Sequence, residues 1–371
     1  MKFSSSSTEL QKALGSIGGV IPSKSTLPIL ENFHLQLTDD KLKITATDLD
    51  TSMSIVIKVK GYEDGTIAIP AKRLFETIRA LPNIDIDFNA NLTSNKVIMT
   101  TISGEYKLTG ESSENYPSIP SFKGVEEIKI ENEILRRLIS KTVFAVSADE
   151  LRPAMMGILF QIKKNEIRTA ATDGHRLVRF INTKFTSNQF EREIIIPGKA
   201  LNLVLKAAND TNSNILFNEN HTMFSFGDTT LVSRMIEEKY PNYESVIPLD
   251  NEKTLIIDKN QLLASVRRTS LYASSTTHQV RLSVKRGTLT VSAEDIDFGS
   301  EARESLQCDY SSEAMEIGFN SAYVIDVLSH IDTDEVVFKF SSATRACIVQ
   351  PATQRDGENL LMLIMPVRLN A

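Results

Sequence analysis

Three sets of sequence markers recur in the same order along this chain of 371 residues, and this repetition is the strongest constraint on its fold. The first marker is a strand-like run followed by a helix-like run. Its copies begin at Phe3, Ile128 and Leu255. The second marker is a run that contains an aspartate. In the three copies this residue is Asp48, Asp173 and Asp295. Separate markers that keep one order and nearly one period indicate a structural repeat rather than chance similarity.

The third marker is a short β-branched run that leads directly into a helix-like run. Its copies occupy residues 65–81, 192–208 and 314–331. Pro70 and Pro197 stand at the start of the first two helices, where a missing N–H is harmless. Asn320 stands there in the third copy and is a good N-cap. The helix start follows the marker aspartate by 22, 24 and 25 residues, so the period is kept within each copy.

The sequence therefore predicts three α+β domains of one kind, each with two helices against antiparallel sheets of some seven or eight strands. We place them at residues 1–124, 125–250 and 251–371, because the Pro- and Asn-rich segments 114–124 and 238–252 are typical of linkers. The expected helices cover residues 8–19, 70–81, 132–145, 197–208, 258–271 and 320–331.

The composition is ordinary for a globular protein, with 41% apolar and 24% charged residues. No apolar run approaches the roughly 20 residues that span a bilayer, and the first residues lack the apolar core of a signal peptide. We therefore expect a cytoplasmic protein without a membrane partner. Cys308 and Cys347 could form a disulfide, but two buried thiols in a reducing cytosol are the favoured interpretation.

The net charge of −6 is distributed unevenly along the chain. The expected helices carry 12 basic and 5 acidic residues, a net +7, so the remainder carries −13. Helix propensity alone favours Lys and Arg, but it favours Glu about as strongly. A basic set of helices on an acidic protein predicts one positive surface. That surface suits phosphates, which are contacted without sequence readout.

The stretch "ATDGHRL" (171–177) raises the alternative of an enzyme, because Asp173 and His175 could be part of a catalytic triad. The chain has no G-x-S-x-G elbow, no H-E-x-x-H and no phosphate-binding loop. The other repeats keep the aspartate but not the residues after it, so we expect the three aspartates to cap turns of the shared fold. We predict no catalysis, no metal and no cofactor. At the other end of the chain, Pro366 should stop the last strand and leave apolar residues over a surface.

Four segments in this order within three repeats resemble the bacterial sliding clamp family, the beta subunits of DNA polymerase III. They are "TLPILENF" (26–33), "ATDGHRL" (171–177), "YPNYESVIP" (240–248) and "MPVRL" (365–369). The resemblance covers residues 1–369. It implies a head-to-tail homodimer that closes a ring of six domains, with the helices lining a hole around duplex DNA. Such a ring would tether the replicative polymerase without catalysis of its own and raise processivity through effective concentration.

The resemblance also implies a pocket between the second and third domains that takes a short peptide from the polymerase catalytic subunit, from an ATP-driven clamp loader, or from other polymerases and repair proteins. The matching positions are Arg152, Met155, Thr172, Gly174, His175, Arg176, Leu177, Pro241, Val246, Thr344, Ala346, Leu363, Met365, Pro366, Val367, Arg368 and Leu369. Leu177, Val246, Leu363 and Met365 would form an apolar floor. His175, Arg176 and Arg368 would be donors at its rim. Asn370 and Ala371 extend past the leucine that often ends the family, and Ser245 stands where many members carry a basic residue.

Two further sets of residues follow from the helices and from the resemblance. The expected DNA-facing residues are Lys24, Lys72, Arg73, Arg79, Arg136, Arg137, Lys141, Lys199, Lys206, Arg267 and Arg268. The expected dimer contacts are Tyr106, Leu108, Leu271 and Tyr272. Those four apolar residues could equally be ordinary core. A hydrolase built on His175, and a scaffold that binds proteins but no DNA, are the competing hypotheses.

Overall fold

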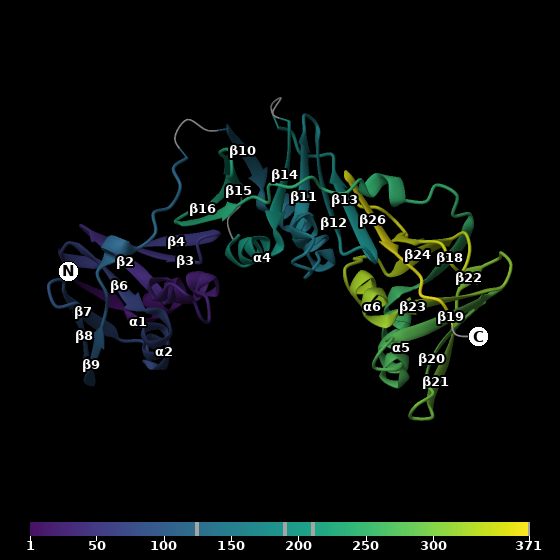
Figure 1. The fold of residues 1–371 in the computed structure, drawn as a ribbon, viewed down its shortest axis with the longest axis horizontal. Helices are drawn as coiled ribbons and strands as arrows, with labels where there is room; N and C mark the ends of the chain where they lie inside the picture. Colours follow the sequence, from purple (N-terminus) through teal and green to yellow (C-terminus); the bar gives the residue numbers. More distant parts are fainter. Residues whose placement is uncertain (123–125, 188–190, 209–211, 370–371) are drawn as a thin grey trace. The chain divides into compact units, whose positions relative to one another are not determined.

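The computed structural model describes residues 1–122, 126–187, 191–208 and 212–369 (Figure 1). Its contacts divide the chain into two units. One unit contains Met1–Glu133 and Lys199–Met235, and the other contains Ile134–Gly198 and Ile236–Ala371. The middle of the chain therefore contributes strands to both units. The expected boundary at 124/125 lies outside the described residues.

The first unit contains two antiparallel sheets. The smaller sheet has the strand order β5-β1-β7-β8-β9, and the larger has the order β10-β15-β16-β17-β4-β3-β2-β6. The smaller sheet comprises β1 (Lys2–Ser6), β5 (Lys60–Glu63), β7 (Asp85–Asn91), β8 (Lys96–Thr101) and β9 (Gly104–Thr109). The larger comprises β2 (Asn32–Thr38), β3 (Lys41–Thr47), β4 (Thr51–Lys58), β6 (Gly65–Pro70), β10 (Glu126–Glu131), β15 (Asn212–Phe217), β16 (His221–Phe226) and β17 (Thr229–Arg234). Pairing of β17 with β4 joins the middle of the chain to its first part in one sheet.

The second unit repeats this plan. Its larger sheet has the order β14-β11-β12-β13-β26-β25-β24-β18-β22, and its smaller sheet has the order β21-β20-β19-β23. The larger comprises β11 (Gly157–Lys163), β12 (Glu166–Thr172), β13 (Arg176–Asn182), β14 (Arg192–Pro197), β18 (Lys253–Asp258), β22 (Asp309–Tyr310), β24 (Glu335–Phe340), β25 (Cys347–Pro351) and β26 (Glu358–Ile364). The smaller comprises β19 (Gln279–Lys285), β20 (Thr288–Asp295), β21 (Ser300–Gln307) and β23 (Met315–Asn320). Pairing of β13 with β26 brings residues 176–182 beside the last strand of the chain.

Each α-helix of the described residues begins directly after a strand, as the repeated markers predicted. The helices are α1 (Ser7–Ile17), α2 (Ala71–Ala80), α3 (Asn132–Ser140), α4 (Gly198–Ala207), α5 (Lys259–Thr269) and α6 (Ser321–Ser329). Asn320 caps α6 by accepting a hydrogen bond from the Ala322 N–H, as expected. Of the described strands, nine lie before residue 124, eight between 125 and 250, and nine after 251. The first and third groups exceed the expected seven or eight, because β5 and the two-residue β22 are too short to show a pattern.

One expected helix was too long. Helix α3 ends at Ser140, and residues 143–145 form a separate 3-10 turn, because the backbone of Thr142 leaves the helical region at φ −126°. Lys141 therefore lies beyond the helix. The helices as observed carry 11 basic and 4 acidic residues, so their net charge is still +7.

The three marker aspartates cap turns, which confirms that prediction. The Oδ1 atoms of Asp48, Asp173 and Asp295 each accept a backbone N–H two or three residues further on. A side chain that closes a turn in this way fixes where one strand ends and the next begins. The repeated aspartate is thus explained by the fold.

The two cysteines are free thiols. Cys347 is buried in β25, as expected, but Cys308 is only half-buried. Burial raises the pKa of both thiols. A search of the described helices found none that is long and apolar enough to cross a membrane.

Candidate functional site

The turn between β12 and β13 is the most tightly specified part of the candidate site. Asp173 Oδ1 accepts hydrogen bonds from the N–H groups of His175 and Arg176, each at 2.9 Å. Thr172 Oγ1 donates to the carbonyl of Arg176 at 2.6 Å and accepts from the Gly174 N–H at 3.1 Å. Gly174 has φ +92°, a conformation that favours glycine, and a Cβ there would lie 2.9 Å from Arg152 Nη1. The sequence of this turn therefore dictates its shape.

Arg176 does not lie at an exposed rim, contrary to the expectation. The side chain is buried, and its guanidinium binds Asp173 Oδ2 at 3.0 Å, Asp326 of α6, and the carbonyl of Phe144. It also lies over the ring of Tyr323, 4.8 Å from the centroid. These partners occupy the donors that a peptide would need. Arg176 instead joins the turn to helix α6.

His175, next to it, is exposed and keeps the expected position at the surface. Its ring lies nearly parallel to that of Tyr323, with centroids 6.1 Å apart. Its carbonyl accepts a hydrogen bond from the Met365 N–H at 2.8 Å. A backbone hydrogen bond therefore joins the turn to the C-terminal segment. Sequence reasoning missed Tyr323, because nothing in the spacing of α6 shows that it faces His175 and Arg176.

The C-terminal segment leaves the sheet where the proline predicted. Strand β26 ends at Ile364, before Pro366. The Val367 N–H then donates to the Gly318 carbonyl at 2.9 Å, and the Leu369 side chain lies over Gly318, where a Cβ would be 2.8 Å away. Arg368 is exposed. Asn370 and Ala371 lie outside the described residues.

The four residues of the expected apolar floor divide into two layers. Leu177 and Leu363 are directly paired between β13 and β26 and are buried in one apolar cluster. Val246 and Met365 are 56% and 41% exposed. Ala346 belongs to the buried cluster. The cluster also contains residues that the sequence did not single out, which are Ala154, Leu159, Ala170, Ile195, Tyr240 and Tyr243. The two tyrosines were missed because they stand in a segment rich in Pro and Asn.

The remaining candidate residues are accessible to different degrees. Arg152, Pro241 and Thr344 are exposed, and Met155 is half-buried. Arg152 forms an ion pair with Asp149 at 2.8 Å. Ser245 donates to the Asn242 carbonyl at 2.7 Å. Exposed apolar side chains over a buried apolar cluster, with polar groups around them, are the chemistry that a short apolar peptide needs.

The expected dimer contacts are not core residues. Leu271 is 81% exposed, and Tyr272 beside it is also exposed, in the 3-10 turn η7 (Ser270–Tyr272). Tyr106 and Leu108 are half-buried on β9, which lies at the edge of its sheet. Exposed large apolar residues on or near sheet edges are typical of an interface.

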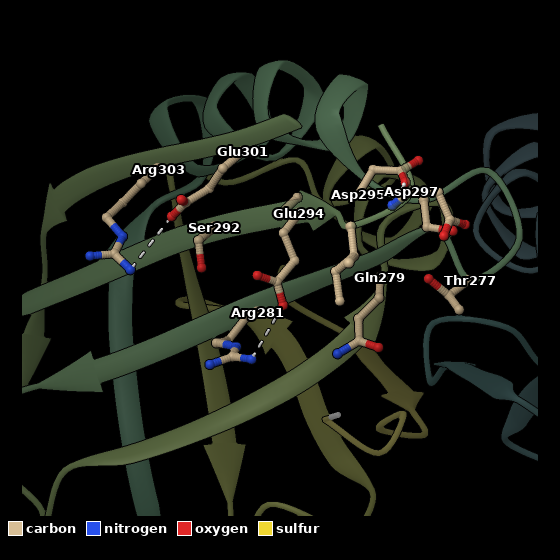
Figure 2. A pocket seen from close by; sticks show the side chains of 12 residues that line it. Thr277, Gln279, Arg281, Ser292, Glu294, Asp295, Asp297, Glu301 and Arg303 are labelled. Carbon is tan, nitrogen blue, oxygen red and sulfur yellow. Dashed lines mark hydrogen bonds and ion pairs between the residues drawn. The ribbon is translucent and has the colours of Figure 1, made fainter. Parts of the chain in front are cut away.

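A polar pocket of about 290 Å³ lies on β19, β20 and β21 in the second unit (Figure 2). Its charged lining includes Arg281, Glu294, Glu301 and Arg303. The Arg281–Glu294 and Arg303–Glu301 ion pairs span 3.9 and 3.8 Å. The sequence analysis did not identify this site, because its residues come from three strands.

The cations expected to face DNA differ in their exposure and in whether a carboxylate already pairs with them. Within the described part of the chain, several are exposed and in no ion pair. These are Lys24, Lys72, Arg73, Arg79, Lys206 and Arg267. Arg136 is exposed on α3. Lys199 and Arg268 are exposed but paired with Asp48 and Glu304.

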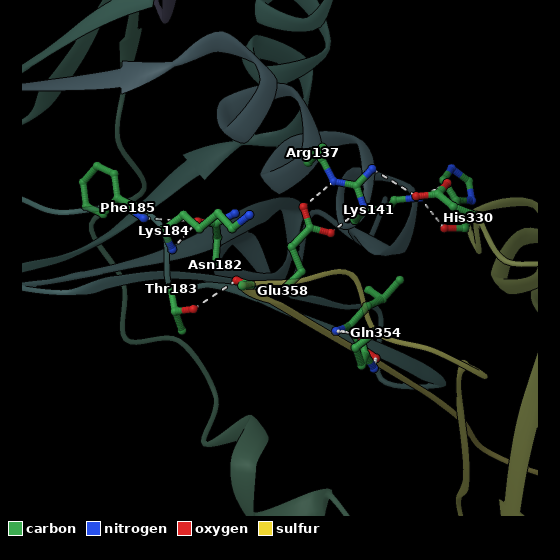
Figure 3. A network of polar contacts seen from close by, with 12 residues as sticks. Arg137, Lys141, Asn182, Thr183, Lys184, Phe185, His330, Gln354 and Glu358 are labelled. Atoms are coloured by element: carbon green, nitrogen blue, oxygen red, sulfur yellow. Dashed lines mark hydrogen bonds and ion pairs between the residues drawn. The ribbon is translucent and has the colours of Figure 1, made fainter.

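Lys141 and Arg137 are poorly placed for contact with phosphates (Figure 3). Lys141 is buried, and its ammonium donates to Asp332 at 2.6 Å and to the His330 carbonyl at 2.7 Å. Burial lowers the pKa of Lys141 and outweighs the hydrogen bond to Asp332. Arg137 binds Glu358 through two donors and Asp332 at 3.0 Å. These ion pairs leave the Lys141 ammonium little freedom to contact phosphates and largely neutralise Arg137.

Comparison with known proteins identifies relatives along the whole chain. Three family profiles match, described as the N-terminal, central and C-terminal domains of the DNA polymerase III beta subunit, over residues 1–120, 129–242 and 244–368. Beta sliding clamps of Chlamydia muridarum and Pseudomonas aeruginosa are each 29% identical and are aligned over 100% of both chains. A crystal structure of the Pseudomonas aeruginosa clamp bound to griselimycin superposes with a TM-score of 0.92 at 28% identity and full coverage of both chains.

Proposed function

This chain belongs to the DNA polymerase III beta subunit family of bacterial sliding clamps, and we propose how its residues serve that function. It is a DNA sliding clamp of replication, a processivity factor without catalysis of its own. The proposal concerns the ring, the surface that meets DNA and the surface that meets partner proteins. The net +7 on the helices of an otherwise acidic chain is the observation that carries it.

Two copies close head to tail into a ring of six domains, whose limits in each chain are residues 1–124, 125–250 and 251–371. The helices line the hole, and the sheets lie outside. Tyr106 and Leu108 of one copy meet Leu271 and Tyr272 of the other, so that strand pairing continues from chain to chain. The exposure of Leu271 and Tyr272 and the position of Tyr106 and Leu108 on an edge strand support this interface.

The exposed cations of the helices contact DNA phosphates without reading bases. Diffuse contacts of this kind are salt-sensitive and permit sliding, whereas base contacts would create positions of arrest. The unpaired residues Lys72, Arg73, Arg79, Lys206 and Arg267 carry most of the attraction, with Lys24 on its loop. Arg137 and Lys141 contribute little, because acidic side chains already neutralise them.

Partner proteins dock a short apolar peptide on the surface formed by His175, Val246, Met365 and their neighbours. The replicative polymerase catalytic subunit, other polymerases, repair proteins and an ATP-driven clamp loader are the proposed partners. A ring carries two such surfaces, so one partner can replace another while the clamp stays on DNA. The Pseudomonas aeruginosa relative is described as bound to griselimycin. We propose that this chain binds the same compound on the surface formed by His175, Val246 and Met365.

The first experiment is the solution mass by light scattering, followed by retention on nicked circular DNA after loading. We expect a mass near twice 41.3 kDa, with protein that stays on circles and is lost once the circle is cut. A monomer, or protein that remains bound after linearisation, would refute the ring.

The DNA-facing residues are tested by reversing three exposed, unpaired cations together, as Arg79→Glu, Lys206→Glu and Arg267→Glu. A matched control reverses three exposed cations that lie outside the helices, Lys96, Lys285 and Arg286. Both triple variants change the net charge equally. We expect the first to lose polymerase stimulation at physiological salt and the second to keep it. Equal activity of the two variants would contradict a basic helix surface.

The docking surface is tested with griselimycin by isothermal titration calorimetry. His175→Ala and Met365→Ala should weaken binding without lowering the melting temperature, because both side chains are exposed. Ile102→Ala, on a turn where the side chain is 95% exposed, is the control and should bind normally. Unchanged affinity in both test variants would place the compound elsewhere.

A further inference from the structure

Arg179 is a half-buried arginine on the sheet face that carries the proposed docking surface. It stands on β13 directly between Ala170 of β12 and Leu361 of β26. Residues two apart on a strand share a face, so Arg179 lies about 7 Å along β13 from Leu177. Leu177 and Ala170 both belong to the buried apolar cluster. A charged side chain therefore stands at the edge of an apolar floor.

The guanidinium of Arg179 lacks a counter-charge. Its Nη2 donates to Asn359 Oδ1 at 3.0 Å, whereas its buried Nε has no hydrogen-bond partner. Within the residues that the structure describes, no carboxylate forms an ion pair with Arg179. Arg168 of β12 and Arg176 of β13, in contrast, each pair with carboxylates of their own chain. A cation that is partly removed from water is costly unless it is paired, so the stability of the single chain does not explain Arg179.

The charge of Arg179 acts on the segment that covers the apolar cluster. Burial and the charge of Glu244 raise the pKa of the Tyr243 phenol, and the positive charges of Arg168 and Arg179 oppose that rise. Tyr243 begins the 3-10 turn that ends at Val246, an exposed residue of the docking surface. The Glu244 carboxylate of this turn pairs with Arg168 at 3.2 Å. The acid closest to Val246 in the chain is therefore already bound to another arginine.

We propose that Arg179 selects partner peptides that carry an aspartate or glutamate, by pairing its guanidinium with that carboxylate. This inference rests on the proposed docking surface and names a residue that determines which peptides the surface prefers. An extended peptide rises about 3.3 Å per residue, so the acid stands about two residues from the apolar side chain that docks over Leu177. Residues two apart in an extended peptide share a face, so both side chains meet the same sheet. The carboxylate supplies the charged acceptor that Arg179 lacks.

The alternative is a purely structural role, in which the stem of Arg179 covers Leu361 and its tip holds Asn359. Long cationic side chains often cover apolar surface in this way. The two roles differ in one measurable respect. A side chain that only packs cannot distinguish an aspartate from an asparagine in a bound peptide, whereas an unpaired guanidinium does so through charge.

Selection from a random heptapeptide library displayed on phage tests the charge preference without a known natural partner. Only clones that bind the Met365→Ala variant more weakly than the wild-type protein are analysed, which restricts the result to the docking surface. The wild-type protein should enrich Asp or Glu two positions from an apolar residue by at least roughly threefold over the library frequency. Arg179→Glu should enrich Lys or Arg at that position instead, because the charge that meets the peptide is reversed.

Isothermal titration calorimetry with one selected peptide and its Asp-to-Asn counterpart measures the size of the preference. The wild-type protein should bind the Asp peptide about fivefold more tightly at low salt, and the ratio should shrink at high salt because ions screen a partly exposed pair. Arg179→Met should reduce the ratio to below about twofold, since it keeps the length of the stem but removes the charge. Arg281→Met changes another half-buried arginine, on the small sheet of the same unit, and is the control that should keep the preference. Arg179→Met should also keep its melting temperature, because the guanidinium makes no ion pair in the described part of the chain.

The outcomes separate the role of Arg179 from the docking surface itself. Peptides that depend on Met365 but show no acidic preference, or an acidic preference that survives Arg179→Glu, overturn the inference and leave the docking surface standing. A lower melting temperature of Arg179→Met with an unchanged preference assigns Arg179 to the fold and overturns the inference in the same way. A selection in which no peptide depends on Met365 overturns the proposed docking surface, and this inference with it.

Discussion

Replacement of Arg176 by alanine should destabilise the second unit more than any change to an exposed ion pair. The guanidinium is buried and holds Asp173, Asp326 and the Phe144 carbonyl. Removal of one partner from a buried ion pair costs about 3–5 kcal/mol, because the other charge is left without compensation. Asp326 is 42% exposed and can be rehydrated, so the lower end of about 3 kcal/mol applies here.

A loss of about 3 kcal/mol corresponds to a fall of roughly 6–12 °C in melting temperature for a folding unit of about 200 residues. Differential scanning calorimetry would measure it, with hydrogen exchange of β12 and β13 assigning the transition to this unit. Arg345→Ala removes a pair with Asp250 in which both side chains are 55% exposed, and it should cost no more than about 1 kcal/mol. Equal effects of the two variants would refute the assignment of Arg176 as a link between the turn and α6.

Three further predictions follow from the same unit. Gly174→Ala should destabilise the second unit by about 1–3 kcal/mol, because residue 174 has a positive φ and an added Cβ would approach Arg152. It should also weaken griselimycin binding. The control is Gly287→Ala, at φ +75° with open space around it, which measures the cost of backbone strain alone in urea denaturation. Burial lowers the pKa of His330 below 6.5, so its contribution to stability is complete above pH 6.5 and is lost as the pH falls through the lowered pKa. His330→Phe keeps the stacking on Phe144 and should show a smaller fall in melting temperature between pH 7.5 and 5. Iodoacetamide should label Cys308 slowly and Cys347 only after unfolding, because both thiol pKa values are raised and Cys347 is buried. Mass spectrometry measures the labelling, and labelling of Cys347 in the folded protein would contradict its burial.

Sequence reasoning succeeded wherever a local rule determines the structure. The strand–helix repeat, the Asn320 cap, the aspartate turns and the end of β26 before Pro366 all depend on residues within a few positions of one another. Backbone geometry and short-range hydrogen bonds are encoded locally, so they can be read without the fold. The length of α3 was wrong because the irregular backbone at Thr142 has no comparable signal.

Sequence reasoning failed wherever a side chain's role depends on a distant partner. Arg176 meets Asp326, 150 residues away, and Arg137 meets Glu358, 221 residues away. A sequence shows that these residues are cations but not whether a carboxylate already faces them. Tyr240 and Tyr243 stand in a segment whose Pro and Asn content indicates a linker, and their burial depends on strands from another part of the chain.

This difference changes how the positive charge of the helices should be counted. The net +7 is unchanged by the observed helix limits, yet it includes Arg137, Lys199 and Arg268, which already have carboxylate partners. Charge that is neutralised within the chain contributes little to the attraction of phosphates, because the field outside a paired cation is that of a dipole. The salt dependence of DNA binding should therefore follow the number of unpaired cations rather than the net charge of the helices. The paired cations Arg137, Lys141 and Arg176 instead hold the second repeat to the third, and so position the surface on which we propose that partners dock.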